Sequence, residues 1–294
     1  MLFRSVVFLV ANDEDDPASS NDSVNNYLFK VPRDASVAEI LESGIGTPPE
    51  QLFGVAIDHV NQVTYFSSFS AGSAVENGNI YKRDADKNVT LVVNLTPDVR
   101  VLGLEFAPET FGGFGGQLIA TTECEDQSAS PDCSSSNEGR MFAIDPLSPS
   151  TPFEFSLSPS VAHLVDLVFA STGELYAVEN NERTARILRI SPTGVVTDLQ
   201  APATQLGLAD GIEIDEGGDR LLVASRTAAG SQLLEVSLGS IPATVKVLAG
   251  PLAPKTIEID DGYFPTGIVY DRLGTVVYHR GNTNTRIDSV SVAP

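Results

Sequence analysis

The chain has 294 residues, enough to bury the core of one large β domain or of two ordinary domains. Its 39 Asp and Glu residues outnumber 18 Lys and Arg residues, which gives a net charge of −21. Such a surface repels phosphate backbones and anionic lipid and attracts cations such as calcium, so nucleic acid is excluded as an expected partner. No apolar run reaches the roughly 18 residues that span a membrane, so we expect no membrane insertion.

Three strands are expected near the N-terminus, at residues 5–11, 26–31 and 36–41. The first run is a marginal signal peptide and fits better as a strand, while a short helix competes over residues 37–42. These strands resemble the second, third and fourth strands of the units that follow. The first strand of this unit is missing, a pattern that a truncated chain would also give.

A short unit then recurs along the chain at intervals of about 45 to 63 residues, a spacing that indicates the blades of a propeller. Each unit opens with a small or acidic residue that begins an alternating strand, and glycine-containing turns separate the strands. The first strands are predicted at residues 54–58, 103–107, 166–170, 211–215 and 267–271.

Each first strand is followed by further strands of the same unit. The second strands are predicted at residues 63–67, 117–121, 174–178, 220–224 and 275–279. The third are predicted at residues 79–83, 139–145, 185–190, 232–236 and 286–290, and the fourth at 89–93, 152–156, 194–198 and 244–248. Four antiparallel strands repeated radially describe a β-propeller. We therefore expect one all-β propeller domain over residues 1–294, with six blades, or five if the last blade borrows an N-terminal strand.

The two cysteines, Cys124 and Cys133, lie in a polar, Ser-rich stretch that interrupts the repeat. A polar loop cannot bury thiols, so the pair predicts a disulfide that staples a loop insertion at about residues 122–138, with two free thiols as the alternative. A zinc site would need more ligands, and the stretch contains no His. A disulfide forms in an oxidising compartment, so we expect an extracellular or periplasmic protein.

The segments Asp210-Gly-Ile-Glu-Ile-Asp-Glu-Gly-Gly-Asp-Arg-Leu-Leu-Val-Ala and Pro265-Thr-Gly-Ile-Val-Tyr-Asp-Arg-Leu-Gly-Thr-Val-Val-Tyr resemble blades of the regucalcin/gluconolactonase and NHL-type six-bladed propellers. The resemblance covers about residues 50–292. It implies a divalent cation at the central pore, held by an N-terminal acidic residue, an Asn that opens one blade and an Asp that opens another. Asp210 stands at the last kind of position. The other openers are Phe53, Leu102, Val165 and Thr266.

Candidate functional residues lie where the strands of a propeller reach its ends. The starts of the innermost strands ring the centre, so Asp166 and Asp210 are candidate ligands for Ca²⁺ or another divalent cation. The alternative is that either carboxylate caps backbone N–H groups. Glu179 and His279, at the ends of second strands, are the candidate general bases. His59 and His163 are predicted in a hairpin turn and a linker.

A Gly-rich stretch, Phe111-Gly-Gly-Phe-Gly-Gly, lacks the helix that would follow a phosphate-binding loop. We expect a long turn whose phenylalanines pack on a neighbouring blade.

Two functions follow from these patterns. We favour an extracytoplasmic, non-catalytic module, monomeric, that binds a small molecule or a protein, because no nucleophile elbow or zinc spacing occurs. The alternative is a divalent-metal-dependent lactonase or esterase-type hydrolase, with the metal at the pore, Asp210 as ligand, and Asp166 or Glu179 assisting.

Overall fold

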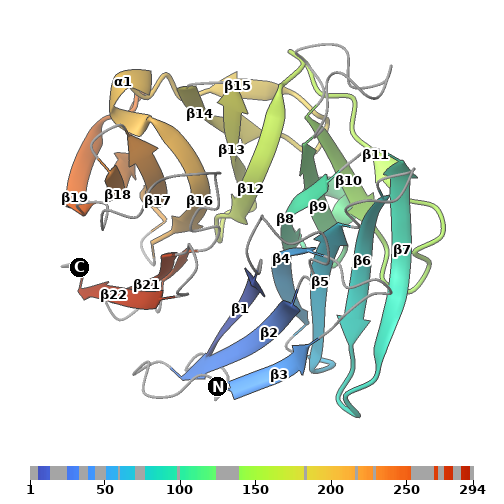
Figure 1. Cartoon of the computed structure of the whole chain (residues 1–294). Helices are drawn as coiled ribbons and strands as arrows, with labels where there is room; N and C mark the ends of the chain where they lie inside the picture. The colour runs from blue at the N-terminus through green and yellow to red at the C-terminus, as the bar shows by residue number, and fades with distance from the viewer. Residues whose placement is uncertain are drawn as a thin grey trace.

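The computed structural model describes residues 6–13, 25–32, 39–43, 51–58, 60–69, 77–97, 100–123, 139–181, 184–215, 218–227, 230–252, 268–270, 275–280 and 286–291. Within these ranges the chain forms six antiparallel sheets arranged around a common centre (Figure 1). The predicted all-β propeller architecture is confirmed.

Four of the sheets have four strands in meander order. They are β4 (Gln51–Asp58), β5 (Val63–Phe69), β6 (Asn77–Arg83) and β7 (Val89–Pro97); β8 (Arg100–Phe106), β9 (Leu118–Glu123), β10 (Arg140–Ile144) and β11 (Phe153–Glu154); β12 (His163–Phe169), β13 (Leu175–Asn181), β14 (Thr184–Ile190) and β15 (Val196–Asp198); and β16 (Leu208–Ile214), β17 (Arg220–Thr227), β18 (Gly230–Ser237) and β19 (Val245–Leu252). Every strand predicted for these units is present.

The two terminal sheets have three described strands each. The first contains β1 (Val6–Asp13), β2 (Asn25–Pro32) and β3 (Glu39–Ser43). The last contains β20 (Ile268–Tyr270), β21 (Thr275–Arg280) and β22 (Arg286–Ser291). Among the described residues these two sheets share no strand. The segment in which a short helix competed with a strand forms β3.

Helical structure in the described ranges is limited to one turn of 3₁₀ helix, η1 (Gly112–Phe114), and one short helix, α1 (Ala203–Leu206). Neither is long and apolar enough to cross a membrane.

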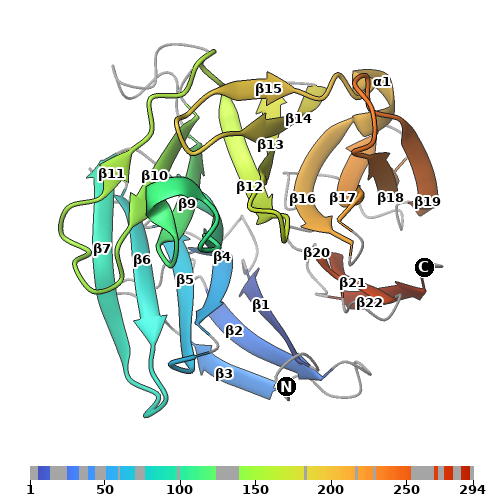
Figure 2. The same ribbon diagram turned by 180° about the vertical axis from the view of Figure 1, so that it is seen from behind.

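The first strands of neighbouring sheets approach one another closely around the centre. Strands β4, β8, β12, β16 and β20 contact each other in that order (Figure 2). A Cβ atom on Gly54 would lie 2.6 Å from the carbonyl oxygen of Leu102, and one on Gly103 would lie 2.9 Å from the Cα atom of Asp166. Glycine is needed at these two positions because the backbone of the next sheet occupies the space of a side chain.

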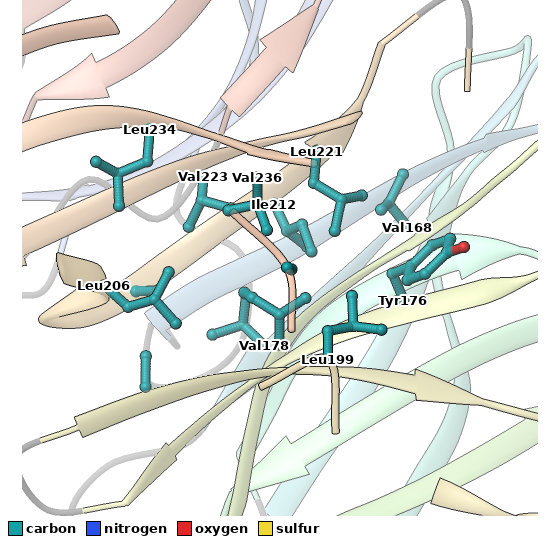
Figure 3. Packing of buried hydrophobic residues seen from close by; sticks show 14 of the residues in the cluster. Val168, Tyr176, Val178, Leu199, Leu206, Ile212, Leu221, Val223, Leu234 and Val236 are labelled. Atoms are coloured by element: carbon teal, nitrogen blue, oxygen red, sulfur yellow. The ribbon is translucent and has the colours of Figure 1, made fainter. Parts of the chain in front are cut away.

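The hydrophobic core is divided into layers between neighbouring sheets. Alternation along each strand sends successive side chains to opposite faces, so each inner strand feeds two layers. In β12, Leu164 and Leu167 join the layer shared with β8–β11, whereas Val168 joins the layer shared with β16–β19. The second of these layers includes Val178, Ile212, Val223 and Leu234 (Figure 3). A third fills the space between β4–β7 and β8–β11.

We predict that Leu234→Ala lowers the free energy of unfolding by about 2–5 kcal/mol, because it removes buried methyl groups from a layer that cannot collapse fully. Leu234 is fully buried in the layer between β12–β15 and β16–β19. The matched control is Val60→Ala, in a turn where the side chain is 89% exposed, with an expected change within about 0.5 kcal/mol. Urea unfolding followed by circular dichroism measures both, and equal effects would contradict the layered core.

Candidate functional site

A β-bulge interrupts the start of each of the four long inner strands. The register shifts between Leu52 and Val55 in β4, Val101 and Gly103 in β8, Leu164 and Asp166 in β12, and Ala209 and Gly211 in β16. A bulge leaves backbone groups outside the ladder, and buried backbone groups need other partners. The unpaired residues of β8, β12 and β16 are Leu102, Val165 and Asp210, which are the predicted blade openers.

Polar side chains from the second strands supply the missing partners. The hydroxyl of Ser67 in β5 accepts the Gly54 N–H at 2.7 Å and donates to the carbonyl oxygen of Val101 at 2.9 Å. The hydroxyl of Thr121 in β9 accepts the Gly103 N–H at 3.1 Å. Both hydroxyls are buried. Ser67 therefore links the bulge of its own sheet to that of the next.

Asp166 lies just after the bulge of β12 and reaches the neighbouring inner strand. Its Oδ2 accepts the N–H of Ile212 in β16 at 3.0 Å, and its Oδ1 accepts the N–H of Leu167 at 2.9 Å. Burial raises the pKa of this carboxyl to about 7, against the opposing effect of the two backbone hydrogen bonds. The candidate metal ligand thus serves, in this structure, as an acceptor for backbone N–H groups.

Glu105 makes a similar contact one sheet earlier, and the sequence reasoning missed it. Its Oε2 accepts the N–H of Phe169 in β12 at 3.0 Å. The available signal was a carboxylate between the apolar residues Leu104 and Phe106. A charged residue there needs a buried partner, and the partner is backbone from the next sheet.

Asn180 and Asp166 hold the bulge of β16 from both sides. The Asn180 side chain accepts the N–H of Ala209 at 3.2 Å and donates to its carbonyl oxygen at 3.0 Å. Asp166 binds Ile212, on the far side of the bulge. The backbone of Asp210 and Gly211 therefore lies between two side chains of the preceding sheet. The side chain of Asp210 lies outside the described residues, so its role as a metal ligand stays a prediction.

Glu179, the candidate general base in β13, is 1% exposed. Its Oε1 accepts the N–H of Ala162 at 2.6 Å, and its Oε2 forms an ion pair with Arg186 across the β13–β14 ladder. Arg186 also lies 3.6 Å from the carboxylate of Asp198. Both oxygens of Glu179 are engaged within its own sheet.

His163 was predicted in a linker, and this was wrong. It is the first residue of β12 and pairs with Asn180 in the ladder. The strand starts three residues before the predicted one because the bulge breaks the period-two pattern that the prediction followed. Its Nδ1 atom is buried and makes no hydrogen bond to the described residues.

Several predicted residues lie wholly or partly outside the described residues. The backbone of His279 belongs to β21, but its side chain is not described. The proposed disulfide of Cys124 and Cys133, and His59, also lie outside the described ranges. Within those ranges, no three His, Cys, Asp or Glu side chains lie close enough to hold a metal ion.

Comparison with known proteins agrees with the fold described above. No protein-family profile and no curated protein matches the sequence. Solved structures do match. Virginiamycin B lyase from Staphylococcus aureus has a TM-score of 0.57 at 14% identity, and the alignment covers 98% of this chain and 89% of the lyase.

Two further structures belong to proteins of other kinds. The periplasmic gluconolactonase of Pseudomonas aeruginosa has a TM-score of 0.58 at 13% identity, with coverage of 98% of this chain and 83% of that one. TolB from Acinetobacter baumannii has a TM-score of 0.60 at 13% identity, with coverage of 96% of this chain and 60% of TolB. At these identities the likeness shows the propeller fold alone, because one fold serves many functions.

The raised pKa of Asp166 predicts a pH dependence of stability. A carboxyl whose pKa is higher in the folded state stabilises the fold below its unfolded pKa of about 4, and this contribution is lost as the pH rises to about 7. We expect Asp166→Asn to become more stable relative to the wild type as the pH rises from 4 to 8. Urea unfolding at several pH values measures the difference, and parallel profiles for the two proteins would contradict it.

Glu179→Ala should lower the free energy of unfolding by about 2–3 kcal/mol, because the change leaves the buried N–H of Ala162 without its acceptor. Glu174, directly before β13, provides the matched control. It pairs with Arg189 at 3.1 Å, with both side chains more than two-fifths exposed, and Glu174→Ala should cost no more than about 1 kcal/mol. Chemical denaturation compares the two variants, and equal losses would show that Glu179 does not hold its sheet.

Proposed function

We propose that this protein is an extracytoplasmic β-propeller that binds a ligand or a protein without catalysing a reaction. The proposal is carried by one observation. Two described carboxylates of the inner strands, on Asp166 and Glu105, hold backbone N–H groups of the next sheet. Glu179 holds backbone and an arginine of its own sheet. These groups maintain the fold, so the exposed loops and strand ends are the surfaces left for recognition.

A general base must reach the proton that it abstracts, within hydrogen-bonding distance or through one water. Glu179 is buried and already bonded through both oxygens, one to the N–H of Ala162 and the other to Arg186. This environment suits a structural carboxylate. Proton transfer to a substrate would require the sheet to give up these contacts.

The extracytoplasmic location is supported by the spacing of Cys124 and Cys133, which suits a disulfide in a polar loop. A protein of the same fold, the gluconolactonase of Pseudomonas aeruginosa, is periplasmic. The acidic surface adds solubility.

The second candidate is a divalent-metal-dependent lactonase or esterase-type hydrolase with Ca²⁺ or another cation at the pore. This candidate is supported by Asp210 and by the structural likeness to gluconolactonases. The described residues do not supply a ligand set, since no three candidate side chains converge and Asp166 is engaged with Leu167 and Ile212. Calcium needs six to eight oxygens, so this candidate depends on Asp210.

The deciding experiment measures the metal content of the purified protein, its melting temperature with calcium or chelator, and hydrolysis of a lactone such as gluconolactone. We expect no stoichiometric ion, no lactone turnover, and a melting temperature unchanged by calcium or chelator. A ligand that binds only the folded state must raise the melting temperature. One bound divalent ion that is lost in Asp210→Ala, together with lactone turnover, would overturn the proposal and establish the hydrolase.

A further inference from the structure

An apolar surface lies where the β8–β11 and β12–β15 sheets meet. We call it the aromatic patch and define it as Phe114, Phe153, Leu157, Pro192 and Val195. Phe114 belongs to η1, and its ring centroid lies 5.0 Å from that of Phe153 in β11. Phe153 is 51% exposed and Val195 is 54% exposed, while the other three are partly exposed. Single exposed apolar residues are ordinary, but adjacent ones indicate an interaction surface.

The patch rests on a fixed aromatic base. Phe155, which is buried, lies 4.7 Å from the ring of Phe114 and 5.2 Å from that of Phe153. Beneath them, the fully buried Phe111 contacts Phe169 of β12 at 4.8 Å. The prediction that a phenylalanine of this turn packs on the neighbouring blade is confirmed for Phe111. A partner would therefore meet rings already held in place, which reduces the entropy lost on binding.

Contacts between the sheets continue the patch beyond the rings. A Cβ atom added to Gly112 would lie 2.8 Å from Cβ of Pro192. The start of η1 therefore packs against the turn between β14 and β15. The backbone at Ser158, one residue after Leu157, pairs with Val195 in a parallel bridge. The N–H of Ser158 donates to the carbonyl of Gly194 at 2.9 Å. The five members thus come from segments that are joined by direct contacts.

The charge around the patch is negative. Glu109 lies against Gly115, directly after η1, and Asp145 follows β10 two residues beyond Ala143, the ladder partner of Phe153. Both are exposed, and neither forms an ion pair with a described cationic side chain. Two arginines of these sheets are already paired with other carboxylates, Arg140 with Glu154 at 2.7 Å and Arg189 with Glu174. The whole chain has a net charge of −21, which has the same sign as the charge around the patch.

We propose that the aromatic patch binds a protein segment that carries Lys or Arg beside an apolar or aromatic side chain. This inference rests on the proposed binding function and names its partner. The apolar side chain would cover Phe114 and Phe153, and the cation would approach Glu109 and Asp145. A second copy of this chain is the disfavoured occupant, because two chains of charge −21 repel each other. Electrostatic attraction would also speed the encounter with a basic partner.

The test uses three synthetic peptides of equal length, one of Lys and Phe, one of Lys and Ser, and one of Glu and Phe. Fluorescence anisotropy with the intact chain measures their affinities. We expect the Lys-Phe peptide to bind at least about tenfold more tightly than either of the others, because both the ring contacts and the charge are needed. Phe153→Ser should weaken binding by about tenfold or more, whereas Val60→Ser, at an apolar site outside the patch that is 89% exposed, should not.

A second variant separates charge from packing. Glu109→Gln should weaken binding of the Lys-Phe peptide by a smaller factor, of about two to five, and should reduce the dependence of binding on salt. Melting temperatures within about 2 °C of the wild type would show that each variant is folded.

The outcomes separate this inference from the proposed function. Equal binding to the Phe153→Ser and Val60→Ser variants would overturn the patch but leave a binding module. Bound metal with lactone turnover would overturn the module and leave the peptide measurement unaffected. A dimer that dissociates in Phe153→Ser, seen by sedimentation, would replace the basic partner with a second copy.

Discussion

The unpaired backbone at the bulges of the inner strands is the constraint on which the centre of this molecule depends. The inner strands approach so closely that a Cβ atom on Gly54 or Gly103 would meet the backbone of the next sheet. At this distance no side chain can shield a backbone group, and water has little room to solvate it. Several of the N–H and carbonyl groups beside the bulges therefore take their partner from a polar side chain nearby, such as Ser67, Thr121 or Asn180.

This constraint explains why polar residues gather at the centre of a protein with no described metal cluster. Asp166 holds Ile212 and Glu105 holds Phe169, so each carboxylate joins its own inner strand to the next. A hydrogen bond from a backbone N–H to a charged oxygen is stronger than one to a neutral oxygen. Burial nevertheless raises the pKa of Asp166, which shows that the desolvation cost exceeds the gain from those bonds. Residues that join sheets can thus have the perturbed pKa values that also mark functional sites.

The strands could be predicted from the sequence because their signal is local. Alternation at period two and the turns between the strands placed every strand of the four complete sheets, including the short outer ones. The starts of the inner strands were missed. Each bulge shifts the alternation by one residue, so the predictions began within the bulge at Gly54 and directly after it at Gly103 and Gly211, and His163 was placed in a linker. Pattern reasoning follows one register and loses the strand where the register changes.

The roles of the site residues could be predicted only in part, since their partners are distant in sequence. Asp166 was correctly placed on an inner strand, but its partner Ile212 is 46 residues away. Only the arrangement of the sheets decides whether that carboxylate meets backbone, a metal or solvent. Glu179 carried no signal of burial, because Arg186 and Ala162 become its partners only when β12, β13 and β14 assemble.

Segments that one sheet has and the other sheets lack are more informative about function than the repeated strands. Neighbouring sheets must present matching layers such as the one around Val178 and Leu234, so the strands of every unit are constrained by packing. The turn at residues 107–117 and the segment at 155–158 are not needed to close a four-stranded sheet, because the β16–β19 sheet has neither. Yet the chain keeps Phe153 half exposed beside Phe114 at this junction, at the cost of hydrated aromatic surface. The buried Phe111 and Phe155 of these segments contribute to the core, and under the proposed binding function the exposed ring of Phe153 contributes to recognition.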